Sequence, residues 1–352
     1  MHNNMIITAN RVIYQEEIFP DLQDRFGYLT NKHKQLIQLL DLIDLHKIFP
    51  RRLWDSLFGR PITNRHAFVK AFIARIIFNL QTTDALIERL KVDSALRSIC
   101  GFDCRANKLP SASSFSRAFA ELSHLNIADK IHEYMIKEHC SEELYEYSAI
   151  DASAISVSEK ATKKKSKKQK AKTTVAQQLG MNTADIISSL STICDFGGKN
   201  DSNGNKSTWK GYKLHTVVNE YNIPVASLVT SASVHDSLCA IPLIRITEER
   251  VDSLYYLGDK GYDAKAIRTE VDNHGKVALI DFNRRGNATD TRSFDEQQKK
   301  RYGNRSFVES SYAQLKLNYL PSYILFRGIN KIKALLNLAL SVIAGVQIMK
   351  YA

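Results

Sequence analysis

Four residues near the end of the chain combine side-chain types and spacing that suit work on a phosphodiester. They follow one another at intervals of three, four and seven residues and are Tyr302, Arg305, Glu309 and Lys316. At about 100° per residue in an α-helix, these intervals bring the four side chains within roughly 60° of one another. Such a helix face would present one metal-binding carboxylate between phosphate-binding cations and a ring that can stack. We interpret the pattern as typical of a nuclease or a strand transferase.

Two aspartates follow apolar stretches that we expect to be strands. Asp151 ends the stretch 147–150 and Asp259 ends the stretch 254–258. A carboxylate at the C-terminal end of a buried strand is costly to desolvate unless a positive charge compensates it. If the two strands are neighbours, both acids meet at one edge of the sheet, and the helix with Glu309 can reach them. Three such carboxylates without a nearby cysteine or histidine pair favour Mg²⁺ or Mn²⁺, and two ions would support in-line phosphoryl displacement.

The charge balance favours a nucleic-acid partner. Among 352 residues, 49 are Lys or Arg and 37 are Asp or Glu, for a formal net charge of +12 and a pI near 9.3. Such an excess attracts polyanions, although a basic pI also aids solubility. Eight of the lysines fall within residues 160–172. Because like charges repel, we expect a basic loop there that contacts the DNA backbone or is a solvated insertion.

The cysteines and apolar segments indicate a cytoplasmic protein. The five cysteines are scattered, as in a reducing compartment, and no closely spaced histidine pair completes a zinc site. The first thirty residues show no secretory pattern. Residues 334–346 are apolar but interrupted by Asn337 and Ser341. We therefore expect a buried terminal helix there and not a membrane span.

The spacing of apolar residues changes near residue 143. Before it, apolar residues recur at helical intervals, which predicts an α-helical N-terminal DNA-binding domain over residues 1–143. Within this part, Ser111 or Ser113 would cap a short helix that carries Arg117. A helix-turn-helix that docks on DNA through Arg117 and an ordinary bundle helix both fit this pattern.

Residues 144–352 predict an α/β domain. Helices are expected over 237–249, after residue 263 and over 302–316. Strands are expected at 145–155, 187–196, 212–218, 223–232, 253–259 and 277–282. Successive strands followed by strands that alternate with helices suit a mixed sheet flanked by helices, as in the ribonuclease H-like fold.

The segment TWKGYKLH carries further candidate DNA contacts. These are Trp209, Lys210, Lys213 and His215. Strand alternation would place Lys213 and His215 on one face, near Asp151 if the strands pair. An amphipathic edge strand with solvated lysines explains the segment equally well. In the later segment SVHDS, we expect Asp236 or Ser237 to cap a helix, and Asp236 as a metal-site carboxylate is the bolder alternative.

Several of these segments together resemble a known family. The chain is similar to DDE transposases of bacterial insertion sequences, in the group with a Tyr-Arg-Glu-Lys signature. The resemblance rests on LPSASSFSRAF, AIDAS, TWKGYKLHTVV, SVHDS, YLGDKGYD and RYGNRSFVESSYAQLK, and the signature spacing is met in full. The second and third acids are only 50 residues apart. The large insertion that some members carry there is missing, so the role of its tryptophan cannot be transferred.

The resemblance implies roles for residues and partners. Asp151, Asp259 and Glu309 would be the metal ligands for Mg²⁺ or Mn²⁺. Tyr302, Arg305 and Lys316 would hold the phosphates and terminal bases of the transposon end. The protein would bind the terminal inverted repeats of its insertion sequence, cut them, and transfer the strand by cut-and-paste transposition. It would act as a homodimer on double-stranded DNA, in the bacterial cytoplasm and in association with the nucleoid.

Two rival functions have recognisable marks. A recombinase with a tyrosine nucleophile needs an Arg, His-x-x-Arg and Tyr set, and neither His215 nor His235 is followed by Arg at that spacing. A non-catalytic DNA-binding repressor derived from a transposase would not need intact acids at all three positions.

Overall fold

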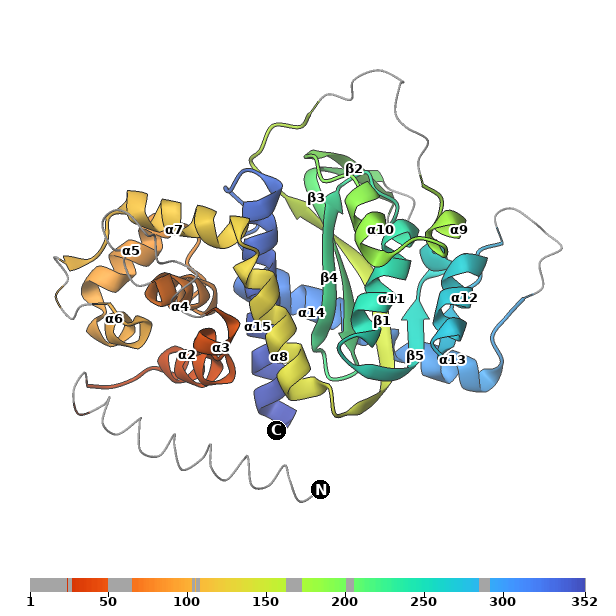
Figure 1. Cartoon of the computed structure of the whole chain (residues 1–352), viewed down its shortest axis with the longest axis horizontal. Coiled ribbons are helices and arrows are strands. Elements are labelled where there is room, and N and C mark those ends of the chain that lie inside the picture. The colour runs from red at the N-terminus through yellow and green to blue at the C-terminus, as the bar shows by residue number, and fades with distance from the viewer. Residues whose placement is uncertain are drawn as a thin grey trace. The chain divides into compact units, whose positions relative to one another are not determined.

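The computed structural model describes residues 24, 27–49, 65–102, 105, 108–162, 173–200, 206–284 and 292–351 (Figure 1). The chain forms two compact units. The helical unit comprises Met1–Met135, Leu317–Pro321 and Lys333–Ala352, and the sheet unit comprises Ile136–Lys316 and Ser322–Ile332. This division differs from a boundary at residue 143, because the end of the chain groups with the N-terminal helices.

The helical unit is built from amphipathic helices around an aromatic core. The ring of Phe115 lies 4.9 Å from that of Phe68, and Phe72 contacts Phe119 at 4.7 Å. Ser111, one of the two expected cap residues, caps the helix that carries Phe115 and Phe119. The helices are α2 (Asn31–Leu42), α3 (Leu45–Ile48), α4 (Arg65–Ile77), α5 (Thr83–Val92), α6 (Ser94–Cys100), α7 (Ala112–His124), most of α8 (Ile127–Cys140) and most of α15 (Ile329–Tyr351).

Helix α15 is the expected terminal helix. In the described part of the chain it is the one helix long and apolar enough to cross a membrane, and 83% of its most apolar window is buried inside the protein. Gly345 explains part of this burial, because a Cβ there would collide with Leu39 of α2. Such burial is that of a core helix.

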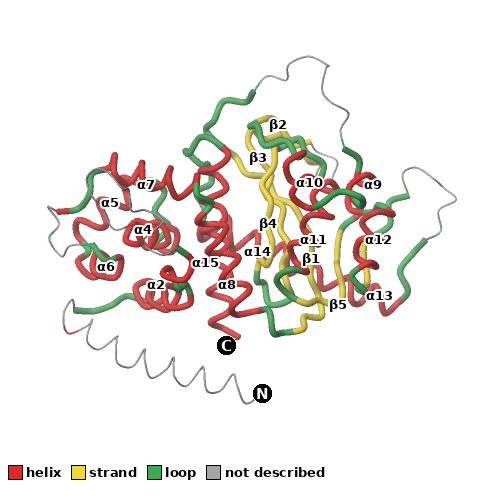
Figure 2. The backbone as a smooth tube through the Cα atoms, viewed as in Figure 1, coloured by secondary structure: helices red, strands yellow, loops and turns green. Residues whose placement is uncertain are grey.

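The sheet unit contains a six-stranded mixed sheet (Figure 2). Its strands are β1 (Leu144–Ser156), β2 (Asp195–Asn200), β3 (Lys206–Asn219), β4 (Pro224–Ser231), β5 (Asp252–Gly258) and β6 (Val277–Ile280). They run in the order β2-β3-β1-β5-β6, and β4 also pairs with β3. Strands β1 and β3 are antiparallel, whereas β1, β5 and β6 are parallel. This arrangement confirms the predicted ribonuclease H-like mixed sheet.

Helices cover both faces of this sheet. Helix α11 packs on β3 and β4, whereas α14 packs on β1 and β3. The helices are α9 (Val175–Gln178), α10 (Thr183–Ser189), α11 (Ala240–Glu248), α12 (Lys265–Asn273), α13 (Glu296–Tyr302) and α14 (Ser306–Gln314). The strand expected over 187–196 is wrong except for its last two residues. Asn182 accepts a hydrogen bond from the Asp185 N–H and so starts α10, and the strand begins only at Asp195.

One glycine allows β3 to approach β1 closely at the end of their pairing. Gly211 has φ +151°, and a Cβ at this position would collide with the Ile155 carbonyl oxygen. Only glycine fits such a close approach of two backbones. This position divides β3 into a part that pairs with β2 and a part that pairs with β4.

Candidate active site

Two aspartates lie level with each other on neighbouring strands. Strands β1 and β5 pair in parallel up to Ala149 and Leu257. Asp151 lies two residues beyond the first and Asp259 two residues beyond the second. Strand β1 continues to Ser156, so the expectation that Asp151 ends its strand is wrong. The two acids still come to the same level, because each lies two residues beyond the last residue pair that joins β1 and β5.

The Asp151 carboxyl group is short of favourable partners. Burial raises its pKa to about 6, and the nearby Asp259 carboxylate also raises it. The Ala152 N–H group and the cations Arg305 and Lys199 act in the opposite direction without cancelling the rise. A desolvated carboxylate beside a second one is stabilised by a cation. The Asp151 carboxylate is therefore costly to ionise in this structure.

Hydrogen bonds fix the backbone around both acids. The Tyr312 hydroxyl donates to the Asp151 carbonyl oxygen at 2.8 Å and accepts from Thr216 Oγ1 at 2.8 Å. Tyr312 is buried, so it ties α14 to β1 and β3. Asp259 accepts from the Gly261 N–H at 2.8 Å and caps the short helix η4 (Lys260–Tyr262).

The predicted helix over 302–316 is not continuous. Helix α13 ends at Tyr302, η5 (Gly303–Arg305) is a 3-10 turn, and α14 leads into the π-helical turn η6 (Leu315–Tyr319). The single 100° step assumed for one α-helix is therefore wrong for this segment. Two of the four residues still meet directly. Arg305 Nη2 donates to Glu309 Oε1 at 2.9 Å, and the Glu309 side chain is 60% exposed.

The other two signature residues interact electrostatically with the aspartates. Partial burial of the Lys316 ammonium lowers its pKa, Lys199 lowers it further, and Asp151 opposes the change. Burial raises the pKa of Tyr302, and Arg305 opposes this rise while Asp259 adds to it. Glu309 differs from Lys316 and Tyr302, because its described contact is the ion pair with Arg305.

The donors present suit a hard divalent cation. Asp151 and Asp259 supply carboxylate oxygens at one level of the sheet, and burial of Asp151 raises its pKa in spite of the nearby Arg305 and Lys199. Among the described residues, no group of three His, Cys, Asp or Glu side chains is arranged to hold a metal ion. Two acids are thus in place, and the third is paired with Arg305.

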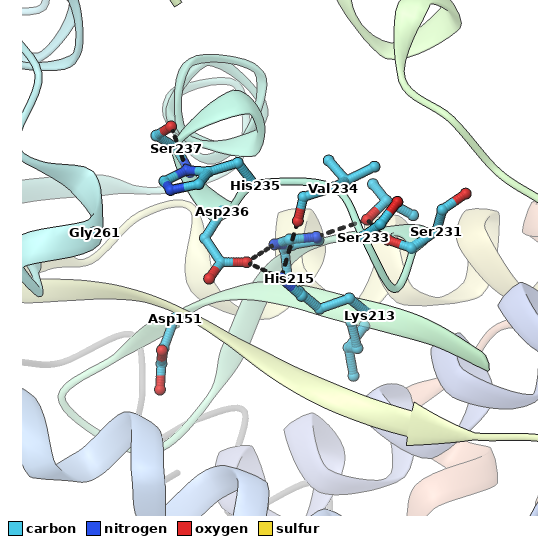
Figure 3. Close-up of polar contacts among 12 residues, drawn as sticks. Asp151, Lys213, His215, Ser231, Ser233, Val234, His235, Asp236, Ser237 and Gly261 are labelled. Carbon is cyan, nitrogen blue, oxygen red and sulfur yellow. Dashed lines mark hydrogen bonds and ion pairs between the residues drawn. The ribbon is translucent and has the colours of Figure 1, made fainter. Parts of the chain in front are cut away.

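A second charged cluster lies on the other face of the sheet. Lys213 Nζ donates to Asp236 Oδ1 and to the Val234 carbonyl oxygen, each at 2.9 Å. His215 Nδ1 lies 3.6 Å from the same Asp236 oxygen, and its Nε2 lies 2.8 Å from Thr230 Oγ1. Figure 3 shows the Asp151 carboxyl group pointing away from this cluster. We call Lys213, His215 and Asp236 the rear cluster.

Strand register explains this separation. Asp151 pairs with Thr216, and His215 pairs with Ala152. Paired residues point to the same face and successive residues to opposite faces, so His215 and Asp151 lie on opposite faces. The expectation that Lys213 and His215 approach the first acid is therefore wrong. His215 is fully buried and burial lowers its pKa to about 4, which leaves no surface for a DNA backbone in this arrangement.

The segment around Asp236 also differs from expectation. The cap of the 3-10 helix η3 (Asp236–Cys239) is His235, whose side chain accepts from the Ser237 N–H, and not Asp236 or Ser237. Asp236 instead neutralises Lys213. Because it faces away from Asp151, Asp236 is not the third acid of the aspartate pair.

Two known protein families match this chain. The family described as Transposase DDE domain matches residues 143–340, more than half of the chain, and the one described as Transposase domain (DUF772) matches residues 23–121. The chain belongs to the DDE transposase family. No curated protein matches it. The matched range of the first family contains both aspartates, Glu309 and the rear cluster.

In this transposase, the other residues predicted to contact DNA are Trp209, Lys210 and Arg117, and they differ in burial. A Cβ on Gly197 would overlap the Trp209 ring, and Trp209 Nε1 donates to the Tyr212 carbonyl oxygen at 3.0 Å, so Trp209 packs on β2. Lys210 pairs with Phe196 and is half-buried. Arg117 is exposed on α7. Most of the predicted basic loop at 160–172 lies outside the described residues.

The sequence reasoning missed two residues of this site. Lys199 of β2 acts on the pKa of both Asp151 and Lys316. It lies 48 residues after Asp151, outside every segment that resembled the family. Tyr312 was also missed, although it lies within the signature segment, because its buried hydroxyl bonds become visible only when α14 packs on the sheet.

Proposed function

We propose that this transposase is a metal-dependent enzyme that cuts DNA at the ends of its insertion sequence and joins the freed 3′ hydroxyl to target DNA. The observation that carries the proposal is the level placement of Asp151 and Asp259 on adjacent parallel strands. The raised pKa of Asp151 supports it, because ionisation of this buried carboxyl group is costly and a bound cation would offset that cost.

Asp151, Asp259 and Glu309 would hold one or two Mg²⁺ or Mn²⁺ ions. When bound, such ions activate a water or a 3′ hydroxyl and stabilise the leaving oxygen of the phosphodiester. Rotation of the exposed Glu309 side chain out of its ion pair with Arg305 would bring the third carboxylate into use. The strands hold the first two acids in place in advance of this change.

The signature cations would hold the DNA. Release of Glu309 frees the Arg305 guanidinium, which binds a phosphate oxygen in a charge-assisted contact. Lys316 and Lys199 supply two more ammonium groups near Asp151. Tyr302 supplies a ring for the terminal bases. The roles proposed for Trp209, Lys210 and Arg117 are contacts with the DNA backbone away from the acids.

The whole protein would act on double-stranded DNA as a homodimer, since two ends must be cut. The helical unit would bind the terminal inverted repeats through α7, and the sheet unit would cut them. Excision by cut and paste, in the bacterial cytoplasm and at the nucleoid, completes the proposal. Its support is the resemblance of the signature spacing together with the excess of basic residues.

A cleavage assay on DNA that carries one end of the element tests the proposal. We expect Mg²⁺-dependent cleavage at a stated ionic strength, and a loss of about 1000-fold or more in Glu309→Gln. Glu296→Gln is the matched control, because Glu296 is an exposed glutamate at the start of α13. Full activity in Glu309→Gln would refute the assignment of the third acid.

Two other outcomes identify the rival functions. Tight binding of the end without cleavage in Mg²⁺ or Mn²⁺ would support a transposase-derived repressor. A covalent adduct between protein and DNA would support a tyrosine recombinase.

A further inference from the structure

Three aromatic rings form a row beside the candidate active site. The ring centroids of Phe282 and Phe294 are 5.2 Å apart, and those of Phe294 and Tyr302 are also 5.2 Å apart. Both ring pairs are tilted, with interplanar angles of 49° and 42°. We call Phe282, Phe294 and Tyr302 the ring row. It joins the segment after β6 to the C-terminal end of α13.

The Phe282 end of the ring row is anchored by two arginines. The guanidinium of Arg268 lies 4.8 Å from the Phe282 ring centroid, and that of Arg292 lies 5.0 Å from it. Cations at this distance are attracted to a ring face. This end of the row is therefore held between two positive groups.

A buried aspartate holds both arginines. Asp263 Oδ1 accepts from Arg268 Nη2 at 2.9 Å, and Asp263 Oδ2 lies 3.4 Å from Arg292 Nη2. The same carboxylate accepts from the Asn283 N–H at 2.8 Å and is 7% exposed. Burial alone would raise its pKa, but these hydrogen bonds and charges lower it overall. Asp263 therefore stays charged and fixes the anchor.

The Tyr302 end of the row has few other supports. Helix α13 contains no buried residue, and neither does η5. A helix without a buried face gains little stability from the hydrophobic core. A capping box between Asp295 and Gln298 and the Arg301 guanidinium, 5.0 Å from the Tyr255 ring centroid, also hold α13, and Arg305 has a side-chain hydrogen bond with Tyr302. Phe294 is the ring that directly contacts Tyr302.

We propose that Phe294 is a positioning residue for Tyr302, and that Phe282, Arg268, Arg292 and Asp263 support it. The inference rests on the proposed function, in which Tyr302 receives the terminal bases of the DNA. Phe294 acts through Tyr302 and touches no DNA itself. Loss of the ring would let Tyr302 shift, and a misplacement of about 1 Å near a reacting group can reduce a rate by about 100-fold.

Substitutions at Phe294 test the role of the ring. Phe294→Leu keeps an apolar side chain without the ring, and we expect its maximal cleavage rate to fall about 10-fold or more with little change in KM. Phe294→Tyr restores a ring and should restore the rate. Tyr221→Leu is the matched control, because it removes a ring from another aromatic pair. The Tyr221 ring lies 5.8 Å from that of Tyr145, which is at the beginning of β1.

A double variant separates positioning from general damage. Phe294→Leu combined with Tyr302→Ala should cleave no more slowly than Tyr302→Ala alone, because the two residues act as one unit. Additive losses would overturn the inference, as would full activity in Phe294→Leu. If Phe294→Leu fails to fold, Arg292→Met replaces it. The Arg292 side chain is 52% exposed, and its removal should give a loss of about 2- to 3-fold in the same direction.

A spectroscopic measurement separates this inference from the proposed function. With fluorotyrosine placed at position 302, the ¹⁹F resonance should move in Phe294→Leu or Arg292→Met and remain unchanged in Tyr221→Leu. An unmoved resonance in all three would overturn the positioning role. A moved resonance in a protein that cuts no DNA would support the positioning role and count against the proposed function alone.

Discussion

The two faces of one sheet carry charged clusters of opposite character. Asp151 pairs with Thr216, the residue after His215, so the side chains of Asp151 and His215 point to opposite faces. On the rear face, Lys213 and Asp236 neutralise each other at 2.9 Å. On the front face, Asp151 has a second carboxylate at its level and a pKa raised to about 6. The comparison teaches that a closed ion pair indicates structure, whereas uncompensated charge indicates a binding site.

The largest expected effect concerns the front face. Asp259→Asn should reduce cleavage of end-containing DNA about 1000-fold or more while a band shift shows unchanged DNA binding, because a metal ligand is lost and the strand remains. Asp252→Asn is the control, since Asp252 lies exposed at the other end of the same strand. Equal loss in both variants would show that β5 has been damaged and would break the contrast between the faces.

The next effect concerns the rear face. Lys213→Met removes the cation from the partly buried Asp236, and we expect a loss of about 1–3 kcal/mol in the free energy of unfolding, measured by urea denaturation. Cleavage at a temperature where the variant is folded should stay within about 3-fold of the original rate. Lys265→Met, at the exposed start of α12, is the control and should leave stability unchanged.

The opposite result for Lys213→Met would contradict the contrast between the two faces of the sheet. Unchanged stability together with lost cleavage would place the rear cluster in the chemistry, and both faces would then belong to one site.

Metal and pH should act together on the front face. The pKa of Asp151 in the folded protein, about 6, exceeds its ordinary value of 3.8, so folding favours the neutral acid. Metal-free stability should therefore fall as pH rises from about 4 to about 6, by roughly 3 kcal/mol at most. In the proposed site, Mg²⁺ binds the ionised Asp151 carboxylate. Added Mg²⁺ should therefore raise the melting temperature more at pH 8 than at pH 5.

Two variants decide whether this coupling belongs to the front face. Asp151→Asn should lose the Mg²⁺ effect at both pH values, whereas Asp252→Asn should retain it. A pH-independent increase in melting temperature that survives Asp151→Asn would place the metal elsewhere.

The smallest effect tests the electrostatic link between Asp151 and the signature. Arg305→Gln removes a cation that lowers the pKa of Asp151, so this pKa should rise further, by less than about one pH unit. Carboxyl ¹³C chemical shifts followed against pH measure the change. Arg117→Gln is the control, because Arg117 is an exposed arginine of the helical unit. An identical titration in both variants would contradict the link.

Local patterns in the sequence predicted most of the elements. The Ser111 cap, the helical spacing of the N-terminal part and the alternation in β3 and β4 each depend on neighbours within a few residues. The segment 187–196 was mistaken for a strand, because a short apolar run fits a strand and a buried helix equally well. The interruption of the 302–316 helix also escaped prediction, although Gly303 starts the 3-10 turn η5; no proline or glycine marks the π-helical turn η6.

The sequence by itself determined the types of residue available for chemistry: two aspartates after apolar stretches, a spaced signature and an excess of basic residues. The tertiary structure decided which of them meet. Parallel pairing of β1 and β5 brought Asp151 level with Asp259, and the register of β3 turned His215 to the opposite face. The ring row depends on three segments that approach only when β6 and α13 are in place. Side-chain direction in a strand reverses with every residue, so register, which long-range pairing sets, decides which residues share a site.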